Sequence, residues 1–142
     1  MQMAKCVVSY EDWQMQCCGD PFKIGDSIDW LVYKWSGNSL DTDDSLIGVD
    51  FIYDTHGTRV DNEMLSLHGV VIEIQAEYYK TEPRLHPRIH NGQKPVPTFV
   101  YEKSYSVTLA DGKDEDIDDL KFGSYRVTLQ DCVLLPVNRE GR

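Results

Sequence analysis

The sequence predicts an all-β, mainly antiparallel fold: a small SH3-like or OB-like barrel, or a sandwich, of six to seven strands with little helix. Two observations predict this class. Aromatic residues make up 11% of the chain and eight are tyrosine, whereas alanine, the strongest helix former, is scarce. Segments of alternating apolar and polar residues recur between turns rich in Gly, Asn, Asp and Pro. The length of 142 residues indicates one domain over residues 1–142.

The first half of the chain supplies three expected strands. Residues 4–10 form a short apolar run, and the segment 11–26 that follows ends in a Gly-Asp turn. Residues 27–35 carry apolar side chains on both faces, which predicts a strand with neighbours on both sides. Residues 44–54 fit a strand at period two, but their leading Asp and Ser residues are also typical helix caps, so strand and helix both stay open there.

The second half supplies three more. Residues 69–79 carry the clearest alternation, and residues 99–109 and 125–136 follow with the same period. In the last of these the phase shifts near Asp131, which predicts a β-bulge. In residues 69–79 the alternation points one set of side chains inward (Val70, Ile72, Ile74, Ala76, Tyr78) and the other toward water (Glu73, Gln75, Glu77).

Two connections stand out by composition. Residues 80–98 hold four of the six prolines without a sustained period, which predicts a long exposed loop, and such loops are usually functional or mobile. This loop is basic, whereas residues 111–119 carry six acids against one lysine. The last residues, 137–142, are expected to form a frayed tail.

The net charge of −10 restricts the partners that the protein is expected to bind. An acidic surface repels nucleic-acid phosphates and anionic membrane surfaces, so nucleic acid is an unlikely partner and a basic protein is favoured. No apolar run approaches the ~20 residues that span a bilayer. The first residues lack the apolar stretch of a secretion signal, so we expect a cytoplasmic location with reduced cysteines.

Residues 13–30, WQMQCCGDPFKIGDSIDW, are similar to the N-terminal signature of a family of uncharacterised bacterial proteins, W-Q-M-x-C-C-G-x-P-F-x-h-G-D-x-h-x-W, where h is apolar. The segments HGVVIEI, residues 68–74, and GSYRVTLQDCVLLP, residues 123–136, look like the central and terminal strands of that family. The resemblance implies a single domain of unknown function and a bacterial origin. It supplies no catalytic residue.

One possible metal site arises from this signature. Cys17 and Cys18, together with His86 and His90 in the Pro-rich loop, would make a Cys2His2 set for zinc. Adjacent side chains on a strand point to opposite faces, so a turn at Gly19 would be needed to aim both thiols at one ion. The alternative, which we favour, is that no cofactor is bound and the two cysteines are packed at a strand end.

The sequence favours a protein without enzymatic activity. Cys17 or Cys18 can be drawn as a dyad with His56 or His68, but both histidines precede glycine, as in turns, and no nucleophile signature accompanies them. The acidic run at residues 41–45 also fails as an EF-hand loop, whose sixth position requires glycine.

The favoured function is a non-enzymatic interaction module that binds another protein. The acidic charge, the long Pro-rich loop and the lack of a complete catalytic pattern motivate this hypothesis. An immunity or antitoxin-like role, in which an acidic domain neutralises a basic toxin, is a special case. The residues expected to contact the partner lie in the basic loop (Arg84, His86, Arg88, His90).

Overall fold

The computed structural model describes residues 2–17, 19–35, 48–54, 64–84 and 96–137. Almost all of its regular structure is β-strand, which confirms the predicted class. Among these residues, one short helix interrupts the strands. The elements are β1 (Gln2–Glu11), α1 (Asp12–Cys17), β2 (Phe22–Lys23), β3 (Ser27–Lys34), β4 (Phe51–Tyr53), β5 (Met64–Arg84), β6 (Val96–Val107), β7 (Leu109–Ala110) and β8 (Lys121–Pro136).

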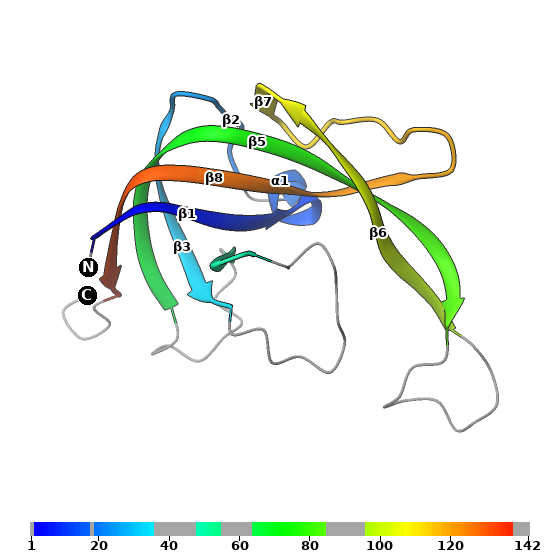
Figure 1. Ribbon diagram of the computed structural model, residues 1–142, viewed down its shortest axis with the longest axis horizontal. Helices are drawn as coiled ribbons and strands as arrows, with labels where there is room; N and C mark the ends of the chain where they lie inside the picture. The colour runs from blue at the N-terminus through cyan, green and yellow to red at the C-terminus, as the bar shows by residue number, and fades with distance from the viewer. Residues whose placement is uncertain (1, 18, 36–47, 55–63, 85–95, 138–142) are drawn as a thin grey trace.

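Five strands close into a barrel in the order β3-β4-β1-β8-β5, and pairing between β3 and β5 completes the ring (Figure 1). Strands β1 and β4 run parallel, whereas the other pairs are antiparallel. The closed ring is the barrel form of the predicted fold and not the sandwich form. Strand β6 adds to β5, and β2 pairs with β7 in a separate two-stranded sheet.

Aromatic side chains fill one end of the barrel core. The rings of Tyr10 and Tyr53 stack with centroids 3.9 Å apart, and Phe22 and Trp30 meet edge to face at 5.0 Å. Tyr125 extends the cluster along β8 through Phe22. Fully buried apolar and aromatic side chains come from β1, β3, β5 and β8 (Tyr10, Val8, Val32, Leu67, Val71, Ile74, Tyr125, Val127, Leu129). Packing of this kind supplies the main free energy of folding.

The N-terminal signature packs against this core. Helix α1 follows β1 directly and contacts β1 and β8. Gln14 is buried and donates to the carbonyl of Tyr53 and to Asp54 Oδ1, each at 3.4 Å. The Gly19 amide donates to the Gln14 carbonyl at 2.9 Å, and a Cβ at Gly19 would lie 1.9 Å from the Tyr10 hydroxyl. The expectation that Cys17 lies at a strand end is therefore wrong, because this residue ends a helix.

The Gly-Asp pair of the signature forms the turn between β2 and β3. Gly25 has a φ of +98°, a conformation that favours glycine, and the Asp26 amide donates to the Lys23 carbonyl at 3.1 Å. The turn is joined to β5, since Gly25 and Asp26 exchange backbone hydrogen bonds with Val71 at 2.8 and 2.9 Å. This part of the signature therefore acts as a structural connection.

The bulge predicted near Asp131 is confirmed. His68 pairs with Val133 and Val70 with Gln130, so β8 has one more residue than β5 between these pairs, and Asp131 has a φ of +55°. A second irregularity, between Val71 and Glu73, shifts the phase of β5 itself.

The inward set predicted for β5 is correct beyond that shift and wrong before it. Ile74, Ala76 and Tyr78 are buried as expected, whereas Val71 is fully buried in place of Val70 and Ile72. The prediction that Glu77 faces water is also wrong, because only 1% of this residue is exposed. The extra residue on β5, Ile72, shifts which side chains point inward, and a strictly alternating pattern does not allow for it.

The long loop predicted at residues 80–98 is wrong at both ends. Residues 80–84 continue β5 and residues 96–98 begin β6, and only residues 85–95 lie outside the described residues. Pro83 stands opposite Pro97 in this ribbon. Neither residue can donate a backbone hydrogen bond, and an antiparallel ladder accepts such a pair where opposite residues exchange no hydrogen bonds.

Two smaller predictions fall at the edges of the described chain. In residues 44–54 the strand alternative is right for Phe51–Tyr53, and residues 48–54 contain no helix, whereas residues 44–47 lie outside the described residues. Of the expected frayed tail, only residue 137 is described.

Candidate functional site

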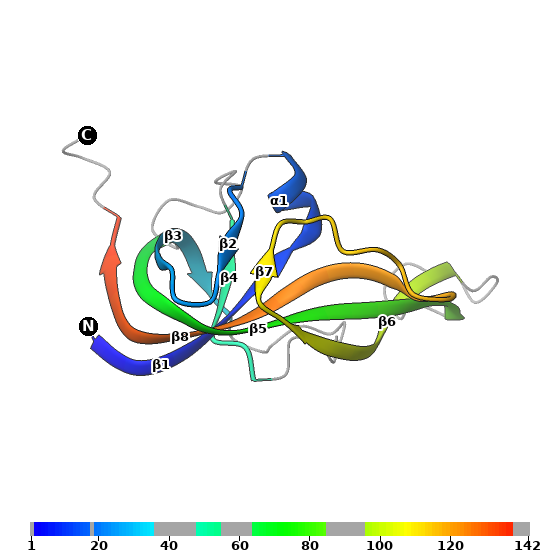
Figure 2. The same cartoon turned by 90° about the horizontal axis from the view of Figure 1, so that it is seen from above.

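The longest strands extend past the barrel as a two-stranded ribbon. Strand β8 pairs with β5 only as far as Tyr79, opposite Lys121, whereas β5 and β6 remain paired to Arg84, opposite Val96. We call residues 80–84 and 96–100 the arm. In Figure 1 the arm curves away from β3, β4 and α1 toward the lower right, and in Figure 2 it again lies far from these elements. Within the described part of the chain, no third strand pairs with the arm.

Two bulges lie where the arm leaves the barrel. Tyr78 pairs with Lys103 and Tyr79 with Tyr101, which leaves Glu102 as an extra residue on β6. On the other side of β5, Glu77 pairs with Ser124 and Tyr78 with Phe122, which leaves Gly123 as an extra residue on β8. Bulges bend a strand and increase its twist. These two insertions at one level of β5 therefore set the direction of the arm.

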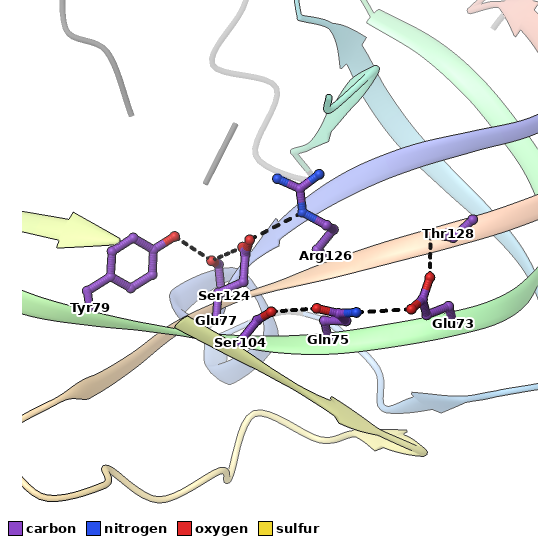
Figure 3. Close-up of polar contacts among 8 residues, drawn as sticks. All are labelled: Glu73, Gln75, Glu77, Tyr79, Ser104, Ser124, Arg126 and Thr128. Atoms are coloured by element: carbon purple, nitrogen blue, oxygen red, sulfur yellow. Dashed lines mark hydrogen bonds and ion pairs between the residues drawn. The ribbon is translucent and has the colours of Figure 1, made fainter. Parts of the chain in front are cut away.

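A hydrogen-bonded chain of four side chains crosses the same level on the outer face of the sheet (Figure 3). Ser124 Oγ donates to Glu77 Oε1 at 2.7 Å, and Arg126 Nε lies 3.4 Å from Glu77 Oε2. The Tyr79 hydroxyl lies 2.8 Å from Ser124 Oγ. Because the Ser124 proton is used toward Glu77, Tyr79 donates to Ser124. The chain thus runs from the base of the arm to the middle of β8.

Glu77 is the centre of this chain and the most unusual residue of the face. Its side chain is 1% exposed, whereas that of Arg126 is 25% exposed. A buried carboxylate is costly unless it is paired and hydrogen-bonded, and here Arg126 and Ser124 provide the charge and a proton donor. The sequence does contain a signal for this contact, which the sequence analysis missed. Ser124 and Arg126 lie two residues apart on β8, so both side chains point to the same side of the sheet as Glu77.

Tyr79 anchors the base of the arm by packing as well. A Cβ built at Gly123 would lie 2.8 Å from the Tyr79 ring, so the ring covers the glycine closely. The Tyr101 ring from β6 packs against Tyr79 with centroids 6.0 Å apart. The bulged glycine therefore gives Tyr79 the room that its hydroxyl needs to reach Ser124.

A second polar row lies beside the first and is more exposed (Figure 3). Ser104 on β6 donates to Gln75, whose amide donates to Glu73 Oε2 at 3.0 Å. Thr128 on β8 donates to Glu73 Oε1 at 3.5 Å. This second row links β6, β5 and β8 through side-chain hydrogen bonds, and Glu73 itself is exposed.

The acidic segment 111–119 is tied to the fold. The Tyr125 hydroxyl accepts from the Gly112 amide at 2.9 Å and donates to Asp114. Burial and the neighbouring Asp114 carboxylate raise the pKa of Tyr125 well above its ordinary value. Asp116 Oδ1 accepts from the Phe122 amide at 3.0 Å. These carboxylates hold the chain that leads into β8.

Most of the predicted site residues fall outside the described chain. Arg84 ends β5 at the far end of the arm, but its side chain is not described, and His86, Arg88 and His90 lie outside the described residues. Of the predicted zinc ligands, only the backbone of Cys17 is described, at the end of α1. The described residues contain no group of three His, Cys, Asp or Glu that could hold a metal ion. The zinc set therefore stays a prediction.

One histidine of the predicted dyads, His68, is described. His68 Nε2 lies 3.5 Å from Asp29 Oδ1, and Ser66 Oγ donates to the same oxygen at 3.2 Å. The Cys17 side chain and Cys18 lie outside the described part of the chain, so a dyad of either cysteine with His68 stays a hypothesis. His56, the other histidine considered for a dyad, lies outside the described residues.

These features define a class of protein: a closed mixed β-barrel that carries a two-stranded arm. Residues 4–131 match the family of unknown function DUF6578, and the chain belongs to this family. No curated protein and no solved structure matches the chain. The described residues include no helix with the length and apolar character of a membrane span. The predicted domain of unknown function is confirmed, whereas the exact signature and the bacterial origin stay predictions.

Proposed function

We propose that the protein is a non-catalytic module that binds another protein by pairing its arm with an extended segment of the partner. The arm is the observation that supports this function. Its two strands pair with each other, and within the described residues the outer edge of β6 and the β5 edge beyond Tyr79 pair with no further strand. Open edges of this kind are ready templates for strand addition.

The energetics of the arm support a role outside the barrel. A two-stranded hairpin is at best marginally stable in water without a third strand or a packed face. The protein nevertheless has three features that fix the arm at its base. They are the hydrogen-bonded row around the buried Glu77, the two bulges, and the contact between Tyr79 and Gly123. A rigid base reduces the conformational entropy that is lost when a partner strand adds to the arm.

The charge of the protein suggests the chemistry of the partner. The net charge of −10 favours a basic protein, whose approach it would accelerate at low salt. Arg84 at the end of the arm, with His86, Arg88 and His90 of the connection, is proposed to contact acidic or backbone groups of the same partner. In its more specific form, the proposal is that the protein neutralises a basic toxin. We further propose that it does so in the cytoplasm.

The proposal is tested with a chain that lacks the arm. Lys80 stands opposite Val100, so residues 81–99 can be replaced by Asn-Gly, which joins the two strands in a tight turn. The barrel variant Glu73→Ala, which keeps the arm, is the matched control. Far-ultraviolet circular dichroism and the urea midpoint show whether each variant is folded.

Tagged wild-type, armless and control proteins are then compared by quantitative mass spectrometry of the proteins they capture from source-cell extract. We expect at least one protein to be captured about tenfold more by the wild type and the control than by the folded armless chain, a difference near 1.4 kcal/mol. Equal recovery with and without the arm would contradict the proposal.

Zinc binding by Cys17, Cys18, His86 and His90 stays the alternative function, supported by the sequence spacing alone. It predicts one zinc ion per purified chain and a loss of thermal stability on chelation. The zinc content of the wild type and of the double variant Cys17→Ser/Cys18→Ser is measured by elemental analysis. One zinc ion per chain in the wild type alone would support this function. Substoichiometric zinc in both proteins would exclude it.

A further inference from the structure

The first and last strands of the barrel bring two thiols together inside the protein. Cys6 lies on β1 and Cys132 on β8, and their Sγ atoms are 3.1 Å apart. Both residues are buried, with 2% and 1% of their surfaces exposed. The other two cysteines of the chain, Cys17 and Cys18, are neighbours in the signature and follow Cys6 after β1.

The bulge at Asp131 creates this proximity. Cys6 stands opposite Leu129 and Cys132 opposite Met3, so the two cysteines are offset along their strands. In a regular strand the side chains of residues 129 and 132 would point to opposite faces. The left-handed conformation of Asp131, with a φ of +55°, reverses this alternation, and both Leu129 and Cys132 are buried. The inserted residue thereby turns the Cys132 thiol toward Cys6.

A surface cavity of about 420 Å³ lies directly beside the pair. Both strands line it, with Gln2, Met3 and Ala4 from β1 and Asp131, Cys132 and Val133 from β8. A reagent of a few atoms in this cavity would meet Cys132 first. Cys6, which does not line the cavity, lies behind it.

We propose that Cys6 and Cys132 form a redox modification site that a peroxide oxidises to a disulfide joining β1 to β8. In the first step the Cys132 thiolate attacks a peroxide oxygen, the O–O bond breaks, and Cys132 sulfenic acid and hydroxide form. In the second step the Cys6 sulfur attacks the sulfenic sulfur, the S–O bond breaks, and the leaving hydroxide takes the Cys6 proton to form water. The peroxide is reduced by two electrons and the two thiols are oxidised by two.

The bond would act on stability and would be slow to form. It would link residues 126 positions apart and so close almost the whole chain into one loop, which strongly restricts the unfolded state. Burial and the neighbouring Cys132 thiol raise the pKa of Cys6, so this thiol reacts as the second and slower partner. This site is independent of the arm and of the function proposed for it.

The test uses the full chain, first reduced, then treated with hydrogen peroxide without denaturant, and finally alkylated. Trypsin alone leaves Cys6, Cys17 and Cys18 on one peptide, so a protease that cuts after Glu11 is added. We expect residues 6–11 linked to the Cys132 peptide, and an unfolding midpoint that rises by roughly 10 °C and reverts with dithiothreitol.

The variant Cys132→Ser is the matched control, and Cys17→Ser/Cys18→Ser shows that the signature cysteines are not needed. Loss of the linked peptide and of the midpoint rise in Cys132→Ser, with both kept in Cys17→Ser/Cys18→Ser, supports the proposal. Recovery of Cys6 and Cys132 as alkylated thiols after prolonged oxidation of the folded wild type would overturn it. Linkage of either residue to Cys17 or Cys18 would overturn it as well.

Discussion

Replacing Glu77 with alanine should destabilise the protein by about 1.5–3 kcal/mol. The substitution removes the acceptor of Ser124 Oγ at 2.7 Å and the ion-pair partner of Arg126 Nε at 3.4 Å. Breaking a fully buried pair costs about 3–5 kcal/mol. Arg126 is 25% exposed, so water can hydrate its guanidinium in part, and we reduce the expected cost to the range of a charged hydrogen bond, about 1.5–3 kcal/mol.

The assay is urea unfolding followed by tryptophan fluorescence and circular dichroism. We expect a lower midpoint with an unchanged slope, because the change affects the native state and leaves the exposed surface on unfolding the same. Glu73→Ala is the matched control: it lies on the same face of β5 but is exposed, so its cost should stay within about 0.5 kcal/mol. Equal, small effects of the two substitutions would refute the argument that Glu77 organises the base of the arm.

Three further outcomes follow from the core and the turns. Gly19→Ala should cost about 1–3 kcal/mol in urea unfolding, because its Cβ would lie 1.9 Å from the Tyr10 hydroxyl, and adding Tyr10→Phe should recover much of that cost. Asp131→Val should cost about 1–2 kcal/mol, since a β-branched residue disfavours a φ of +55°, whereas Asp131→Gly should be tolerated. Burial raises the pKa of Tyr10 and Tyr125 in the folded protein. Below pH ~10 both tyrosines are protonated in the folded and the unfolded state, so the stability is unaffected. Above that pH only the unfolded chain loses these protons, and each tyrosine lowers the stability by up to about 1.4 kcal/mol per pH unit. Tyrosinate absorbance should therefore appear with unfolding, and ionisation of both residues in the folded protein would contradict the burial argument.

The sequence was sufficient to locate those strands in which apolar and polar residues alternate regularly. The strand at residues 27–35 was located almost to the residue, because its pattern is uninterrupted and its neighbours β4 and β5 cover both edges. The shift at Asp131 was also visible, since a bulge displaces the apolar residues on one strand. The helix α1 was missed because six residues are too few to show a helical period.

The candidate site was harder to predict, for two physical reasons. Composition suggested a loop wherever prolines gathered, but Pro83 and Pro97 fit a ribbon when they stand opposite each other. Burial of Glu77 depends on Ser124 and Arg126, more than forty residues further along the chain, and alternation within one strand carries no information about them. The proximity of Cys6 and Cys132 likewise depends on a pairing of the two ends of the chain.

The state of the arm in the isolated protein tests the account most directly. Amide hydrogen exchange, read by mass spectrometry, compares residues 80–84 and 96–100 with the part of β5 that pairs with both β3 and β8. We predict that the arm amides exchange at least about tenfold faster than those of the barrel, since a two-stranded ribbon opens easily without a third strand. Equal protection of arm and barrel would mean that the arm edges are already covered, and would contradict a site that is open for a partner strand.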